Sequence, residues 1–177
     1  MTTELLCDSW PLQLPEPATP DPVARVQVQE EYLARHLGPW LRANGEAALA
    51  GLHSYHFMRY LDATHLSPLT GIILEFRILG PSPILDAAQA ALDGELERQR
   101  SAGIVAAYFR KQRGAWHTSL IPAYGGPEMA EPFAAFLSAA SKLTLELLKE
   151  PQHPFQSRSM VLDRWAHCFR LVTSCTG

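Results

Sequence analysis

The chain has 177 residues, of which 47% are hydrophobic and 19% charged, and its formal net charge is −3. These values are typical of one globular domain that is long enough to bury its own core. The negative charge excludes a global basic field for nucleic acid or anionic lipid, and no apolar run reaches the ~18 residues of a membrane span.

Residues 1–22 are rich in proline, which predicts an extended N-terminal arm ahead of a single domain at 23–177. Trp10, Leu12 and Leu14 are too apolar to remain solvated in such an arm. We therefore expect the arm to pack on the domain itself or on a second subunit, so a homodimer is one of the partner states we keep open.

Apolar spacing predicts a helix over residues 23–44, with a break or kink at Gly38-Pro39, and a short continuation over 46–53. Alternating side chains then predict strands over 54–61 and 71–79. In the first of these strands Arg59 shares a face with Tyr55 and Phe57, whereas His56 and Met58 lie on the other face.

Ser82-Pro83 is a favourable helix start, with the Ser82 hydroxyl as N-cap, and the helix is expected to reach about Arg100. A third strand is predicted at 104–111, a turn at Gly114 and a short fourth strand at 116–122.

A helix with 3.6-residue periodicity is predicted after Pro127, and a last helix over residues 157–173. Helices placed before, within and after a run of strands favour the α+β class. We therefore expect an antiparallel sheet of about four strands packed against helices.

Arg59 is the first candidate for chemistry, because a guanidinium among aromatic neighbours needs an anionic partner. Glu75 on the neighbouring strand would make an ordinary cross-strand ion pair. Alternatively, Arg59 grips an anion or carboxylate in a cleft. Both interpretations stay open from the residues alone.

Three further candidates lie towards the C-terminus. His167 and Arg170 are three residues apart on one helical face, and His167 is either a proton carrier or a hydrogen-bonded surface residue. Tyr124 precedes a Gly-Gly turn whose free N–H groups would hold an anion, unless the turn merely starts a helix. Tyr124 itself either donates a phenolic proton or packs.

The chain lacks the usual motifs for metals and nucleotides. None of its seven histidines stands in a His-Glu-x-x-His motif, and there is no phosphate-binding glycine motif. We expect no metal and no cofactor. Cys7, Cys168 and Cys175 form no Cys-x-x-Cys pair, and no signal peptide is recognisable, which favours a cytoplasmic protein with buried structural thiols.

Five short segments occur in the order found in one enzyme-domain family. These are residues 57–66 (FMRYLDATHL), 73–81 (ILEFRILGP), 101–109 (SAGIVAAYF), 124–148, which begin with Tyr-Gly-Gly, and 165–171 (WAHCFRL). Together they resemble the C-terminal domain of SpaB-type lantibiotic dehydratases, also called the thiopeptide-type bacteriocin biosynthesis domain. The resemblance covers roughly residues 24–175.

The resemblance implies carbon–heteroatom elimination or cyclisation on a modified ribosomal peptide, which is the expected partner. Such chemistry needs a base and a group that stabilises developing negative charge. By position, the family's catalytic residues would be His167, Arg59, Arg77 and Tyr124. Substrate-binding roles would fall to the three residues Arg170, Tyr60 and His65.

The chain also departs from the family pattern. His65-Leu66 is followed by Ser67-Pro68, so that only Arg77 remains of the two arginines in the family pattern. Phe169 stands where the family pattern has an asparagine. Two hypotheses follow. The first is a lyase-type maturation enzyme acting on a dehydrated peptide by acid–base elimination, cyclisation or C-terminal cleavage. The second is a non-catalytic peptide-binding or dimeric partner subunit of a larger biosynthetic enzyme.

The enzyme hypothesis requires a particular arrangement of Arg59 and Arg77. Arg59 and Arg77 should lie on adjacent antiparallel strands and point into one concave surface, because each guanidinium would otherwise be left unpaired among apolar neighbours.

Overall fold

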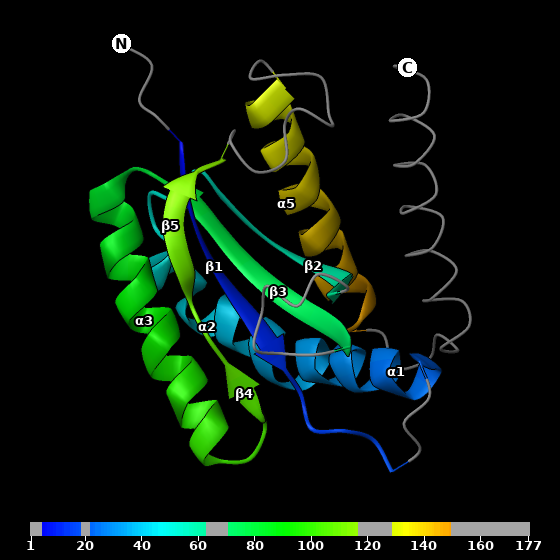
Figure 1. Ribbon diagram of the computed structural model, residues 1–177. Helices are drawn as coiled ribbons and strands as arrows, with labels where there is room; N and C mark the ends of the chain where they lie inside the picture. The colour runs from blue at the N-terminus through cyan, green and yellow to red at the C-terminus, as the bar shows by residue number, and fades with distance from the viewer. Residues whose placement is uncertain (1–4, 19–21, 63–70, 117–128, 150–177) are drawn as a thin grey trace, which may run out of the picture.

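The computed structural model describes residues 5–18, 22–62, 71–116 and 129–149 (Figure 1). It confirms the α+β class, with a five-stranded sheet packed against helices. The strands are β1 Leu6–Gln13, β2 Ser54–Asp62, β3 Gly71–Gly80, β4 Ala107–Tyr108 and β5 Lys111–Ala115. The helices are α1 Pro22–Tyr32, the π-helical turn η1 Leu33–Leu37, α2 Gly38–Ala48, α3 Ser82–Ser101 and α5 Ala130–Leu147.

The Pro-rich N-terminal segment contributes a central strand. β1 pairs antiparallel with β3 on one side and with β4 and β5 on the other, and β2 pairs antiparallel with β3. The side chains of Trp10 and Leu12 are at most 1% exposed and that of Leu14 is 9% exposed. The expectation that these three residues pack on the domain is confirmed, and residues 6–13 are part of the sheet.

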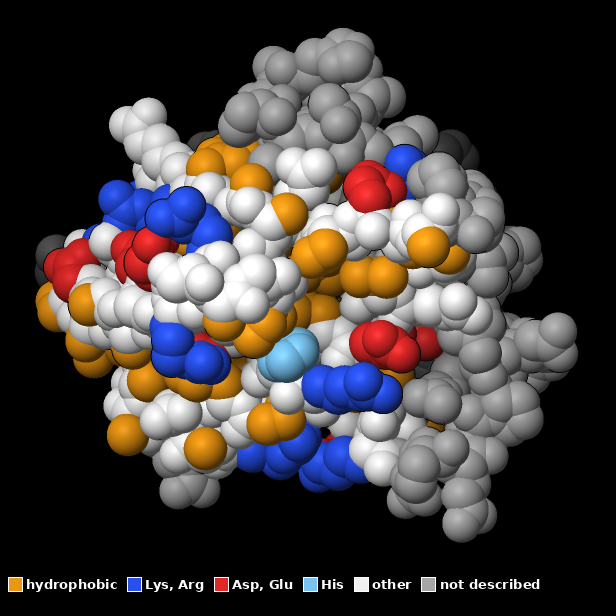
Figure 2. Space-filling model, turned by 90° about the horizontal axis from the view of Figure 1, so that it is seen from below, with side chains coloured by type: hydrophobic (Ala, Val, Ile, Leu, Met, Phe, Trp, Pro, Cys, Tyr) orange, Lys and Arg blue, Asp and Glu red, His pale blue; other side chains and the backbone are white. Residues whose placement is uncertain are grey.

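One face of the sheet is covered by helices. In Figure 1, α1 and α2 follow one another below the strands and α3 lies beside the strands; all three helices contribute to one core with β1 and β3. Seen from below, the surface of the molecule mixes hydrophobic, basic and acidic side chains (Figure 2). The core between these layers joins alternate residues of β1 and β3 to apolar residues of the helices. Its most buried members are Trp10, Leu12, Leu33, Leu37, Leu74, Phe76, Ile78, Leu85, Leu92 and Leu96.

The bend predicted at Gly38-Pro39 is a π-helical turn. The Gly38 N–H donates to the carbonyl of Leu33, five residues earlier. Because Pro39 has no N–H and its ring crowds the preceding turn, a regular α-helix cannot continue through it. Gly38 is needed there, since a Cβ atom would lie 2.6 Å from the Leu33 oxygen.

Three details of the predicted elements were wrong. The strand expected at 104–111 is reduced to β4, and β5 begins only at Lys111; the two short strands pair with opposite ends of β1. Gly114 lies within β5 and makes no turn. Pro81, not Ser82, is the N-cap of α3, and the Ser82 hydroxyl instead accepts a hydrogen bond from Arg113. Residues 117–122 and 157–173, predicted as a strand and a helix, lie outside the described residues.

Helix α5 lies along β2, the edge strand of the sheet (Figure 1). The Phe57 N–H donates to the Ser141 hydroxyl at 3.1 Å, and the same hydroxyl donates to the Phe57 carbonyl at 3.4 Å. A single serine therefore satisfies both the N–H and the C=O of one residue on this strand edge.

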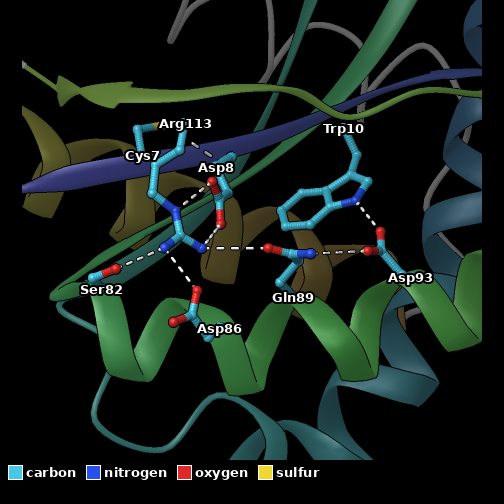
Figure 3. A network of polar contacts seen from close by, with 8 residues as sticks. All are labelled: Cys7, Asp8, Trp10, Ser82, Asp86, Gln89, Asp93 and Arg113. Carbon is cyan, nitrogen blue, oxygen red and sulfur yellow. Dashed lines mark hydrogen bonds and ion pairs between the residues drawn. The ribbon is translucent and has the colours of Figure 1, made fainter.

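A polar network joins the sheet to α3 (Figure 3). Arg113 on β5 donates twice to the buried carboxylate of Asp8, at 2.9 and 2.7 Å, and also to Ser82 and Asp86 at 2.8 Å. These bonds raise the pKa of Arg113 above its ordinary value, the Asp8 bond most strongly. The network fully engages this arginine in holding β5 and β1 against α3.

Candidate functional site

Arg59 and Arg77 lie on adjacent antiparallel strands, as expected, but not on one surface. The register pairs Arg59 with Leu74 and Arg77 with His56. Directly opposed residues share a face, and successive residues alternate, so the two arginines project from opposite faces of the sheet. The prediction that both point into one cleft was therefore wrong.

Arg59 projects towards the helices. Its guanidinium lies 3.5 Å from the carboxylate of Glu30 on α1, whose side chain is 5% exposed. Glu75 belongs to the other face, because it is paired with Met58. Glu30, the ionic partner of Arg59, thus lies on α1, a helix for which the sequence predicted only apolar packing.

Arg77 belongs to a polar row that crosses the other face. The register aligns His56 of β2, Arg77 of β3, Ser9 of β1 and Lys111 of β5. Glu75, two residues before Arg77, is fully buried and accepts from Arg77 Nε at 2.5 Å and Lys111 Nζ at 2.7 Å. We call His56, Glu75, Arg77 and Lys111 the charged cluster.

His56 is the unusual member of the charged cluster. Its side chain is fully buried, and neither Nδ1 nor Nε2 has a hydrogen-bond partner among the residues that the structure describes. Burial lowers its pKa from 6.5 to about 3, Arg77 adds to this effect, and Glu75 opposes it. The ring is therefore neutral near pH 7, with one nitrogen able to donate and the other to accept.

Trp116 covers this histidine and the neighbouring arginine. The rings of His56 and Trp116 meet edge to face with centroids 5.4 Å apart, and the Arg77 guanidinium lies 6.0 Å from the Trp116 ring centroid. Trp116 in turn stacks on Phe133 of α5 and donates its indole N–H to the Ala130 carbonyl. Aromatic side chains therefore cover the charged cluster at His56 and Arg77.

Cys7 lies on β1 two residues before Ser9, and it is paired with Leu79 of β3. Burial raises the pKa of its thiol to about 12, although Arg77 acts in the opposite direction. A thiol that stays protonated near neutral pH is a poor nucleophile, which agrees with the structural role expected for the cysteines.

The charged cluster carries one net positive charge, because two cations face one carboxylate and a neutral imidazole. Such a group can hold a carboxylate or a polarised carbonyl oxygen. Sequence reasoning found Arg77 but missed His56, Lys111 and Trp116. The alternation in β2 already separated His56 from Arg59, but only the register shows which of the two lies beside Arg77.

The remaining candidates cannot be placed. His65, Tyr124, His167 and Arg170 lie outside the described residues. Tyr60 lies in β2 opposite Ile73, and its side chain is not described. Among the residues that are described, no group of three or more His, Cys, Asp or Glu side chains is arranged to hold a metal ion.

Comparison with known proteins gives a likeness in fold. Neither a family model nor a curated protein matches the chain. A similar solved structure is MibB, a tRNA-dependent lantibiotic dehydratase from Microbispora sp. 107891, with a TM-score of 0.61 and 20% sequence identity. The match covers 84% of this chain but only 12% of that protein. The chain therefore has a lantibiotic dehydratase-like fold and corresponds to a small part of that neighbour.

Proposed function

We propose that the protein takes part in the maturation of a ribosomally made peptide natural product. The observation that carries this proposal is the likeness in fold to part of a lantibiotic dehydratase, which extends over 84% of the chain. The ordered motifs in the sequence point to the same class of biosynthesis. The expected partner is a modified precursor peptide, and the expected compartment is the cytoplasm; no described helix is long and apolar enough to span a bilayer.

In the enzymatic form of the proposal, the protein acts on a dehydrated, thiopeptide-like peptide by acid–base elimination, cyclisation or C-terminal cleavage. His167 moves the proton, with Tyr124 as a second proton donor, and Arg170, Tyr60 and His65 contact the substrate. Arg77 holds a carboxylate or carbonyl oxygen together with Lys111, its neighbour across Glu75. Arg59 serves in substrate positioning from the opposite face, through its contact with Glu30.

The test is incubation of the purified protein with a dehydrated precursor peptide, followed by mass spectrometry. A change in peptide mass supports the enzyme. His167→Ala should then lower turnover by about 10²–10⁴-fold, the usual contribution of a general acid–base group, with little loss of peptide binding. If His65→Ala produces that loss and His167→Ala does not, the proton carrier has been assigned to the wrong histidine.

A second candidate function is a non-catalytic subunit that binds the peptide, as a partner of a larger enzyme or as a dimer. One observation favours it. Two of the potential acid–base or nucleophilic groups near Arg77, His56 and Cys7, have pKa values displaced to about 3 and about 12, away from neutral pH. Binding of the precursor without any change in its mass would support this candidate over the enzyme.

A further inference from the structure

A pocket of about 450 Å³ lies between α2, the start of β2 and α5. This volume lies within the range of small-ligand sites. Leucines line it, among them Leu41, Leu49 and Leu145, together with the polar residues Arg42, Ser54 and Lys142. Neither Arg59 nor Arg77 is among the lining residues.

The charges around this pocket are unbalanced. Arg42 and Lys142 line it from α2 and α5, and neither forms an ion pair with another described residue. Lys142 Nζ lies 5.6 Å from the centroid of the Tyr55 ring. The acidic lining residue, Glu146, is already paired with Lys149 at 2.5 Å. Among the described lining residues, two cations therefore stand against one carboxylate, which is shared with Lys149, and this excess of positive charge favours an anionic ligand.

The other walls are aliphatic. Leu41, Leu49, Leu52 and Leu145 line the same space, and Leu41, Leu49 and Leu145 are themselves at most 7% exposed. A bare inorganic anion would leave these walls uncovered. A group that joins a carboxylate to an aliphatic body would satisfy the cations and the leucines together.

We propose that this pocket binds a carboxylate attached to an aliphatic body, and that its natural occupant is the C-terminal residue of a peptide. The identity of the occupant as a peptide rests on the proposed function, whereas the carboxylate chemistry rests on the pocket alone. An acidic side chain offers the same carboxylate, but it lacks the aliphatic group that would fill the space between the leucines.

The experiment is a titration of the full ¹⁵N-labelled chain with small probes, followed through the amide signals of Gly45, Ser54 and Tyr55. N-acetyl-leucine carries the free carboxylate, and N-acetyl-leucine amide is the matched neutral probe. We expect the acid to bind at least about tenfold more tightly than the amide. N-acetyl-glutamic acid α-amide presents only a side-chain carboxylate, and it should bind more weakly than N-acetyl-leucine. Equal or tighter binding of this third probe would overturn the assignment to a peptide C-terminus.

Matched variants test the cations. Arg42→Gln and Lys142→Gln should each weaken binding of N-acetyl-leucine by about fivefold, and both residues are exposed, so the fold should persist. Arg110→Gln removes the same charge from an exposed residue outside the pocket and should leave binding unchanged. Equal binding of the acid and amide probes, or an equal loss in all three variants, would overturn the proposal.

The outcome for the pocket is separable from the outcome for the proposed function. If N-acetyl-leucine binds as expected but a dehydrated precursor neither binds nor changes mass, the carboxylate site stands and the peptide-maturation role fails. If the precursor is processed and Arg42→Gln has no effect on either ligand, the carboxylate site is overturned and the proposed function stands.

Discussion

The His56 ring packs edge to face against Trp116, with 5.4 Å between the ring centroids, and neither ring nitrogen hydrogen-bonds to a described residue. A buried polar ring without partners costs free energy that an apolar ring of similar size would not. Residues that reduce stability in this way are concentrated at functional sites. Its neighbours in the charged cluster give the same face of the sheet the ability to hold an anion.

His56→Phe should therefore change the free energy of unfolding at pH 7.5 by less than about 1 kcal/mol, or increase it. The difference should grow in acid. In the wild type, the unfolded chain binds a proton at His56 below about pH 6.5, whereas the folded chain does so only near pH 3. The wild type thus loses stability as the pH falls through this range, by about 2 kcal/mol at pH 5 relative to the variant.

Urea unfolding of both proteins at pH 7.5 and pH 5 measures this difference, and the other six histidines cancel between them. If the two proteins lose the same stability between these pH values, then His56 is not held neutral by its surroundings. A large loss of stability in the variant at pH 7.5 would mean that the imidazole has a polar partner in the folded protein.

Glu75→Gln should be strongly destabilising. The carboxylate is fully buried and pairs with both Arg77 and Lys111, so the change replaces the charged acceptor of two ion pairs by a neutral amide. Breaking a buried ion pair from one side costs about 3–5 kcal/mol. Glu131→Gln, at an exposed position on α5, is the matched control and should cost less than about 0.5 kcal/mol. Urea unfolding at pH 7 measures both, and a similar small effect in the two variants would contradict the prediction.

The strands were predictable where local pattern decides them. Alternation located β2 and β3 and separated Arg59 from His56 within β2. It could not place Arg59 relative to Arg77, because a one-residue change of register exchanges the faces of a strand. The register depends on long-range pairing that no local window contains, and here it put the two arginines on opposite faces.

β1 was missed for a different reason. Its prolines indicated an extended arm, yet Asp8, Trp10 and Leu12 alternate towards the helices, as a half-buried strand requires. Pro11 is tolerated within this strand, although proline supplies no N–H to a ladder. The partners of β1 lie about 60 to 110 residues away in the sequence, so its role was not visible locally.

The network in Figure 3 makes a prediction about Asp8. The Asp8 side chain is 1% exposed and accepts both bonds of the Arg113 fork, whereas the Asp86 side chain is 66% exposed. Asp8→Ala should cost about 3 kcal/mol or more, because the arginine loses its buried partner. Asp86→Ala removes a solvent-screened contact to the same arginine and should cost less than about 1 kcal/mol.

Thermal unfolding of the two aspartate variants beside the wild type at pH 7 provides the measurement. Equal destabilisation by Asp8→Ala and Asp86→Ala would show that Arg113 holds α3 rather than β1, which would contradict the role assigned to the buried pair. A loss confined to Asp8→Ala would agree with a network centred on β1 and β5.

Cys7 should resist alkylation in the folded protein. Burial raises the pKa of its thiol to about 12, and the sulfur lies 3.6 Å from the Asp8 carbonyl, to which the protonated form donates weakly. Since the thiolate is the reactive species, and an unperturbed thiol titrates near pH 8.5, iodoacetamide at pH 8 should modify Cys7 at least about a hundredfold more slowly than in the urea-unfolded chain. Peptide mapping by mass spectrometry measures the rate at Cys7 separately from Cys168 and Cys175. Equal rates in the folded and unfolded chains would mean that the Cys7 thiol ionises freely on this face of the sheet, and that it belongs with His56 and Arg77 as a reactive group rather than with the core.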